Sequence, residues 1–201
     1  MIDTLRRAGF KDENVLEAMQ KVPRHYFLEK AFEEWAYQNV AFPIGAAQTI
    51  SQPLTVAIQT SLLEVRPGQK VLEVGTGSGY QACILATLGA KVYTIERQSA
   101  LFGKTDTLLR EIGFGMIRTF LGDGYAGLPR FAPFDHILVT AGATAFPAQL
   151  AEQLAVGGHL VIPIGEGDTQ MMWRYTRATD GTFTGEQFGR FKFVPFLKGT
   201  E

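Results

Sequence analysis

The strongest constraint on the fold is an alternation of two patterns between residues 70 and 165. Short β-rich runs occur at 71–74, 91–96, 116–120, 135–140 and 159–164. They are separated by helical periodicity at about 80–88, at 99–111 and from about 147. Strands that alternate with helices form βαβ units, and these place the strands in a parallel sheet with right-handed crossovers. The pattern predicts an α/β fold with a mostly parallel sheet and helices on both faces.

The residues before this core predict a helical extension. Asp12 is a good N-cap for a helix that ends near Pro23, and a second helical stretch is expected over 26–35. Residues 38–52 are expected to form a loop, after which Pro53 suits the first turn of a third helix.

The residues after the core predict additional strands. Runs at 171–177 and 189–196 are β-like, and a hairpin-type turn at 179–182 lies between them. We expect at least one of these strands to be antiparallel at the edge of the sheet.

Charge and cysteine content exclude several classes of protein. The 201 residues carry 19 basic and 20 acidic side chains, a balance that counts against a general nucleic-acid binder but leaves a local basic patch open. Cys83 is the only cysteine, so no intrachain disulfide can form. The first residues do not read as a signal peptide, and no apolar run is long enough to span a membrane. A cytoplasmic protein is therefore expected.

Glycine is in excess, and its position is informative. The chain has 22 glycines, against about 14 at average usage. The first β-rich run leads directly into 75–80, G-T-G-S-G-Y, and a helix follows. Such a loop lets a ligand approach the backbone closely and places free N–H groups at a positive helix end. The dinucleotide fingerprint G-x-G-x-x-G would need glycine at position 80, where this chain has Tyr80.

Acidic residues at the ends of three successive strands predict the ligand. Glu73 precedes the glycines, and the pattern E-x-G-x-G-x-G resembles the S-adenosylmethionine signature of α/β methyltransferases. Glu96 ends the second strand, where a carboxylate can accept both ribose hydroxyls. Asp123 lies between two glycines after the third strand and would accept from an adenine amino group. The alternatives are a surface acid for Glu96, a helix N-cap for Asp123 and a merely capping role for Thr140. The expected cofactor-binding residues are Glu73, Gly75, Thr76, Gly77, Gly79, Tyr80, Glu96, Gly122, Asp123, Gly124 and Thr140.

The whole chain resembles the protein-L-isoaspartate (D-aspartate) O-methyltransferase family. The most specific stretch is 43–53, which reads P-I-G-A-A-Q-T-I-S-Q-P where the family has P-I-G-x-G-Q-T-I-S-x-P. Residues 71–81, 157–165 and 190–196 are also similar. Ala47 departs from the usual glycine, which could stiffen the loop, and Gly142 replaces a usual alanine.

The resemblance implies a class I S-adenosylmethionine-dependent methyltransferase fold and a repair reaction. The family methylates the free α-carboxylate of L-isoaspartyl residues in damaged proteins, and the ester then closes to a succinimide that reopens partly to aspartate. Activity on D-aspartyl residues stays open. By resemblance Ser51 is the catalytic residue, although it could instead be the N-cap of the following helix. The implied substrate-binding residues are Gln48, Thr49, Ile50, Ser51 and Val194.

The resemblance also implies how the chain is organised. We expect one domain over 1–201, a monomer whose partners are damaged proteins. Its three parts are a helical and substrate-loop region at 1–66, a cofactor-binding core at 67–165 and a β extension at 166–201.

Other functions are less well supported. A nucleic-acid amine methyltransferase would carry an Asn/Asp-Pro-Pro-aromatic run after the fourth strand, where residues 140–143 read T-A-G-A. A cytosine C5 enzyme would need a Pro-Cys nucleophile, and an NAD-dependent oxidoreductase is disfavoured by the glycine spacing. A small-molecule O-methyltransferase is disfavoured only by the resemblance, and a non-catalytic binding protein only by the presence of Ser51. The three histidines have no metal-ligand spacing, so no metal site is expected.

Overall fold

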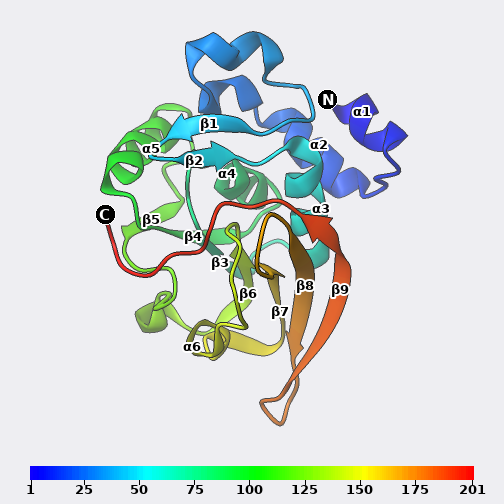
Figure 1. Cartoon of the computed structure of the whole chain (residues 1–201), viewed down its shortest axis with the longest axis vertical. Helices are drawn as coiled ribbons and strands as arrows, with labels where there is room; N and C mark the ends of the chain where they lie inside the picture. Colours follow the sequence, from blue (N-terminus) through cyan, green and yellow to red (C-terminus); the bar gives the residue numbers. More distant parts are fainter.

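The computed structural model describes residues 1–201 and is built on one seven-stranded sheet, with the strand order β5-β4-β3-β6-β7-β8-β9 (Figure 1). Strands β3 to β7 pair in parallel, and β8 and β9 add to one edge in antiparallel. This confirms the predicted α/β fold, with both C-terminal strands antiparallel. The strands are β3 Lys70–Val74, β4 Lys91–Glu96, β5 Arg118–Leu121, β6 Phe134–Val139, β7 Leu154–Ile164, β8 Gln170–Arg177 and β9 Phe183–Phe191.

Helices cover the two faces of the sheet unequally. Val71 belongs to a core cluster of 26 buried residues built with α2, α3, α4 and α5, whereas its neighbour Leu72 faces a cluster of 12 that includes α6. Adjacent strand residues point to opposite faces, so these two clusters lie on either side of the sheet. The helices are α1 Ile2–Arg7, α2 Glu13–Lys21, α3 Pro53–Leu63, α4 Tyr80–Thr87, α5 Ser99–Glu111 and α6 Ala148–Ala151, with 3₁₀ turns η1 Arg24–Phe27, η2 Lys30–Trp35 and η3 Pro129–Phe131.

Two N-terminal predictions are wrong. The helix expected over 26–35 is two 3₁₀ helices, η1 and η2, interrupted at Leu28, whose backbone is extended. Its apolar spacing does not mark a buried face, because Tyr26 is 51% and Trp35 45% exposed. The loop expected over 38–52 contains an antiparallel hairpin of β1 Phe42–Gly45 and β2 Gln48–Ile50.

Some boundaries also differ. The third core strand begins at Arg118 rather than 116, and the last strand runs from Phe183 to Phe191 rather than over 189–196. The N-cap prediction for Asp12 is confirmed, because its carboxylate accepts from the Val15 amide at 3.2 Å. Pro53 begins α3 as predicted.

The chain returns to the carboxyl edge of the sheet after β9. The C-terminal segment 192–201 runs back across the molecule below the β1–β2 hairpin and ends near α5 (Figure 1). It is tied to the sheet through Gly142, whose amide donates to the Val194 carbonyl at 2.8 Å and whose carbonyl accepts from the Phe196 amide at 2.8 Å. No helix is long and apolar enough to cross a membrane.

Candidate active site

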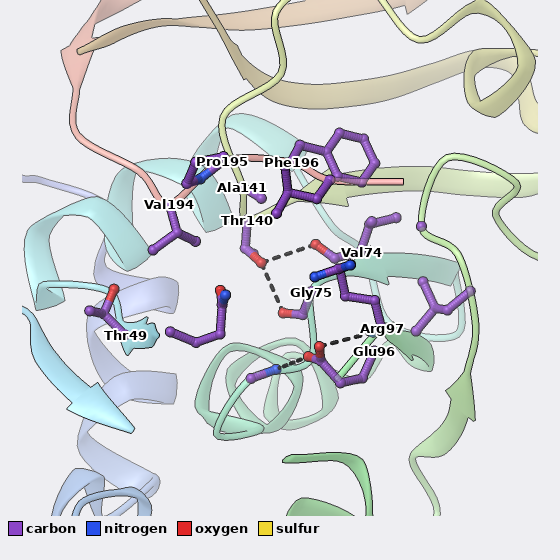
Figure 2. Close-up of a pocket in the computed structure, with 15 residues that line it drawn as sticks. Thr49, Val74, Gly75, Glu96, Arg97, Thr140, Ala141, Val194, Pro195 and Phe196 are labelled. Carbon is purple, nitrogen blue, oxygen red and sulfur yellow. Dashed lines mark hydrogen bonds between the residues drawn. The ribbon is translucent and has the colours of Figure 1, made fainter. Parts of the chain in front are cut away.

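An open cleft lies at the carboxyl ends of β3, β4 and β6 (Figure 2). It encloses about 570 Å³, including the part that merges with solvent. Three distant parts of the sequence meet there: the β2 strand, the strand ends of the core, and the C-terminal segment. The lining residues are Gln48, Thr49, Val74, Gly75, Gly77, Ile95, Glu96, Arg97, Gly124, Thr140, Ala141, Val194, Pro195, Phe196 and Leu197.

The glycine loop forms one wall of this cleft. Gly75, Gly77 and Gly79 have φ values of +98°, +53° and +87°, which only glycine adopts at little cost. A Cβ atom on Gly75 would lie 2.5 Å from the hydroxyl oxygen of Thr140. That hydroxyl points to the carbonyls of Val74 at 3.0 Å and Gly75 at 2.8 Å, so Thr140 holds the loop in place from the end of β6 (Figure 2).

Glu96 is held rigidly at the end of β4. Its Oε2 accepts from the Gly77 amide at 2.8 Å, and its Oε1 accepts from the amides of Arg97 and Gln98 at 2.9 Å each (Figure 2 shows the first two). The alternative of a surface acid is wrong, because the residue is only 4% exposed. A carboxylate offers about four acceptor positions, so a bound diol would share this group with the backbone amides.

Asp123 is already engaged by the protein. Its carboxylate accepts from the Tyr125 amide at 2.8 Å and from the Gly199 amide at 2.9 Å. No helix follows it, so the N-cap alternative is wrong. Tyr125 stacks on Phe196, which lines the cleft, with ring centres 3.8 Å apart. Gly122 and Asp123 do not line the cleft themselves, whereas Gly124 does.

A second, more polar cavity lies behind the shared wall of Thr49, Gly75, Gly77 and Thr140. It is here that the structure brings Ser51 next to the glycine loop. Ser51 does not cap the next helix, because the N-cap of α3 is Gln52 and no side chain caps it. The lining residues are Thr49, Ile50, Ser51, Val56, Gln59, Glu73, Gly75, Thr76, Gly77, Ser78, Tyr80, Gln81 and Thr140. Gly79 is absent from both cavities; it packs against α5.

Comparison with known proteins decides the family. The model of the protein-L-isoaspartate(D-aspartate) O-methyltransferase family matches residues 1–201. The chain belongs to this family. Protein-L-isoaspartate O-methyltransferases from Flavobacterium psychrophilum and Cytophaga hutchinsonii are each 54% identical to it, over 98% of this chain and 92% and 89% of theirs.

Two solved structures of the same family have the same fold. A protein-L-isoaspartate O-methyltransferase structure aligns with 96% of this chain and 64% of its own, with a TM-score of 0.86 and 25% identity. A Plasmodium falciparum protein assigned the same activity, in complex with S-adenosyl-L-homocysteine, aligns with 98% of this chain and 97% of its own, with a TM-score of 0.85 and 25% identity. The methyltransferase fold predicted from the sequence is confirmed.

The polar cavity fits the cofactor of this methyltransferase family. Glu73 is fully buried; its Oε2 accepts from the Thr94 hydroxyl at 2.6 Å, while its Oε1 has no partner. A buried acceptor without a donor is costly, and S-adenosylmethionine carries an ammonium group that can donate. Burial raises the pKa of Glu73 to about 8, and the Thr94 hydrogen bond opposes this rise. The residues present therefore suit S-adenosylmethionine, the cofactor of these methyltransferases.

Sequence reasoning missed several residues of the methyltransferase site. Pro195, Phe196 and Leu197 line the cleft although only the general similarity of 190–196 pointed to that segment, and Arg97 lines it next to the predicted Glu96. Arg24 is completely buried and donates to the Ser51 carbonyl at 2.9 Å. The only available signal was its place in the run V-P-R-H-Y-F at 22–27, which is a poor predictor of burial for an arginine.

Proposed function

We propose that this methyltransferase transfers a methyl group from S-adenosylmethionine to the free α-carboxylate of L-isoaspartyl residues in damaged proteins. The observation that carries this proposal is the position of Ser51. The family-specific β2 segment brings it to a cavity that shares a wall with the cleft of the glycine loop. Thr49, Gly75, Gly77 and Thr140 line both spaces, so cofactor and acceptor would meet beside the glycine loop, as a direct transfer between two substrates requires.

The reaction asks little acid–base chemistry of the protein. When bound, S-adenosylmethionine supplies a methyl group already activated by its sulfonium. An α-carboxylate has a reference pKa of about 3.5, so the acceptor is ionised at neutral pH and needs no general base. The residues of the site must instead align the two reactants and exclude water.

Ser51 is the proposed catalytic residue because it is a neutral donor. Its hydroxyl would donate to one oxygen of the acceptor carboxylate and fix the direction of the other. A cation bound directly to that carboxylate would draw charge from the attacking oxygen. Gln48, Thr49 and Ile50 in β2 are proposed to shape the mouth of the site.

Val194 is proposed to bind the backbone of the damaged peptide. Its carbonyl already accepts from the Gly142 amide, and Pro195 has no N–H to offer. The Val194 amide is therefore the group we assign to an extended peptide, in the manner of an added strand.

The cofactor residues proposed from the sequence are retained, with distinct tasks. The glycine loop would present its backbone to the cofactor, and Glu96 would accept from the ribose. Asp123 would accept from the adenine while keeping the C-terminal segment attached through Gly199.

A matched pair of peptides tests the acceptor. One isoaspartyl peptide has a free α-carboxylate and the other has that group converted to an amide. We expect methyl transfer from labelled S-adenosylmethionine to the first peptide only. Labelling of both peptides would show that another group is the acceptor and would refute the assignment.

We further infer that the enzyme acts as a cytoplasmic monomer that does not bind nucleic acid, and that its single domain has the three parts expected from the sequence. The net charge of −1 and the single buried cysteine support this inference. Light scattering of the purified protein tests the monomer, and a dimer mass would contradict it.

A further inference from the structure

Arg24 is a buried cation beside the site, and the proposed function gives it no role. Arg24 in η1 is 0% exposed and has no carboxylate partner among the ion pairs of the protein. Its Nε donates to the Ala36 carbonyl at 3.0 Å and its Nη2 donates to the Ser51 carbonyl at 2.9 Å, while its Nη1 has no partner. The guanidinium carbon lies 4.8 Å from the centre of the Tyr80 ring.

Burial of the Arg24 charge is energetically unfavourable. Burial lowers the pKa of Arg24 to about 10, so the side chain is still charged at neutral pH. A charge removed from water without a counter-ion is disfavoured. A smaller neutral side chain could donate to two backbone carbonyls, so these two hydrogen bonds do not by themselves require an arginine.

The three groups that Arg24 contacts belong to three different segments of the chain, two of which line the site. Ser51 follows the three-residue strand β2, Ala36 ends η2, and Tyr80 is the first residue of α4, immediately after the glycine loop. Tyr80 and Ser51 line the same polar cavity. One rigid guanidinium therefore connects the segment that carries Ser51 to the helix that begins at the glycine loop.

We propose that Arg24 is a positioning residue that fixes the Ser51 segment relative to the glycine loop through the Ser51 carbonyl and the Tyr80 ring. This inference rests on the proposed role of Ser51. A fork with several donors on a planar group can hold two carbonyls and stack on a ring at once, whereas a lysine ammonium lacks that shape. Misplacement of reacting groups by about 1 Å can cost roughly 100-fold in rate.

The test compares Arg24→Lys and Arg24→Gln with Arg177→Lys as the matched control. Arg177 also donates to two backbone carbonyls, those of Glu152 and Leu154, and it lines neither cavity. We expect both Arg24 variants to lower kcat on an isoaspartyl peptide by roughly 10- to 100-fold, with S-adenosylhomocysteine affinity and peptide KM nearly unchanged. Arg177→Lys should lower thermal stability but not kcat. If Arg24→Gln does not fold, Arg24→Lys carries the test.

A double-mutant cycle with Ser51→Ala separates this inference from the proposed function. If Arg24 acts through Ser51, Arg24→Lys should slow the Ser51→Ala enzyme by less than about twofold, because the two changes remove one shared effect. Folded Arg24 variants with wild-type kcat, rate losses that multiply with that of Ser51→Ala, or a parallel loss of cofactor affinity would each overturn the role of Arg24. A wild-type rate for Ser51→Ala would instead overturn the catalytic role of Ser51.

Discussion

The close packing of the glycine loop against β6 can be tested with Gly75→Ala. Gly75 has φ +98°, and a Cβ atom there would lie 2.5 Å from the Thr140 hydroxyl oxygen. The added methyl would therefore meet two penalties. The backbone would carry an L-residue in the left-handed region, and the Thr140 side chain would have to move away from the carbonyls of Val74 and Gly75.

The size of the effect follows from these two penalties. A non-glycine residue at positive φ costs about 1–2 kcal/mol. Weakening the Thr140 hydrogen bond, in which one hydroxyl proton is shared between two carbonyls, adds about 0.5–1.5 kcal/mol. The total of ~1.5–3.5 kcal/mol is a sizeable part of the roughly 5–15 kcal/mol that stabilises a typical domain. For a chain of this length, melting should fall by about 2–4 °C for each kcal/mol.

The assay is thermal and urea denaturation of Gly75→Ala beside Gly113→Ala. Gly113 is the matched control because its φ is +86° but nothing lies within 4 Å of its added Cβ atom. Gly113→Ala should show the backbone penalty alone. Thr140→Ala should make the Gly75→Ala change milder, since it removes the atom in the way. Equal losses at positions 75 and 113 would refute the packing between the loop and Thr140.

Three further changes probe other groups of the site. Glu73→Gln should remove a pH dependence of stability. The folded pKa of Glu73 is about 8, above its usual 4.5, so between these pH values the folded protein holds a proton that the unfolded chain has lost. The free energy of unfolding of the wild type should therefore fall by roughly 1.4 kcal/mol for each unit by which the pH rises in this range. Parallel urea-stability curves of variant and wild type from pH 5 to 8 would contradict this. Asp123→Ala should weaken S-adenosylhomocysteine binding about tenfold, a difference of ~1.4 kcal/mol; unchanged calorimetric affinity would rule out the adenine role. Ala47→Gly should stabilise the protein by up to about 1 kcal/mol, because Ala47 has φ +52° and the relief of strain exceeds the entropy that glycine adds to the unfolded chain. A lower melting temperature for Ala47→Gly would show that the turn is not strained.

The core of the fold was predictable because its signals are local. The core strands are visible in the sequence as β-rich runs, although β7 begins at Leu154, before the predicted run at 159–164, and α4 and α5 follow within a few residues of strand ends. The predicted bounds of β4 and α5 match the structure residue for residue. Periodicity failed over 26–35, where apolar spacing is present but Tyr26 and Trp35 are exposed, so the spacing does not report a packed helix face.

The β1–β2 hairpin was missed for a different reason. Its strands are four and three residues long, and its turn places Ala46 and Ala47 at positive φ without the Asn-Gly or Asp-Gly pair that usually predicts such a turn.

The site was predictable only where one segment carries the whole signal. The glycine loop and Glu96 lie on the cleft as their spacing in the sequence suggests. Contacts between distant segments were not predictable, because no local pattern encodes them. The Gly199 amide on Asp123 and the pairing of Gly142 with the C-terminal segment are two examples. Arg24, separated from Ser51 by 27 positions, is a third.

The central claim is tested most directly by kcat/KM for two peptides of identical sequence that differ only in an isoaspartyl or an aspartyl link at one position. Labelled S-adenosylmethionine reports methyl transfer to each. We predict transfer to the isoaspartyl peptide and none to its aspartyl twin. Equal transfer to both, or transfer to neither by folded protein that binds the cofactor, would contradict isoaspartyl recognition by this chain.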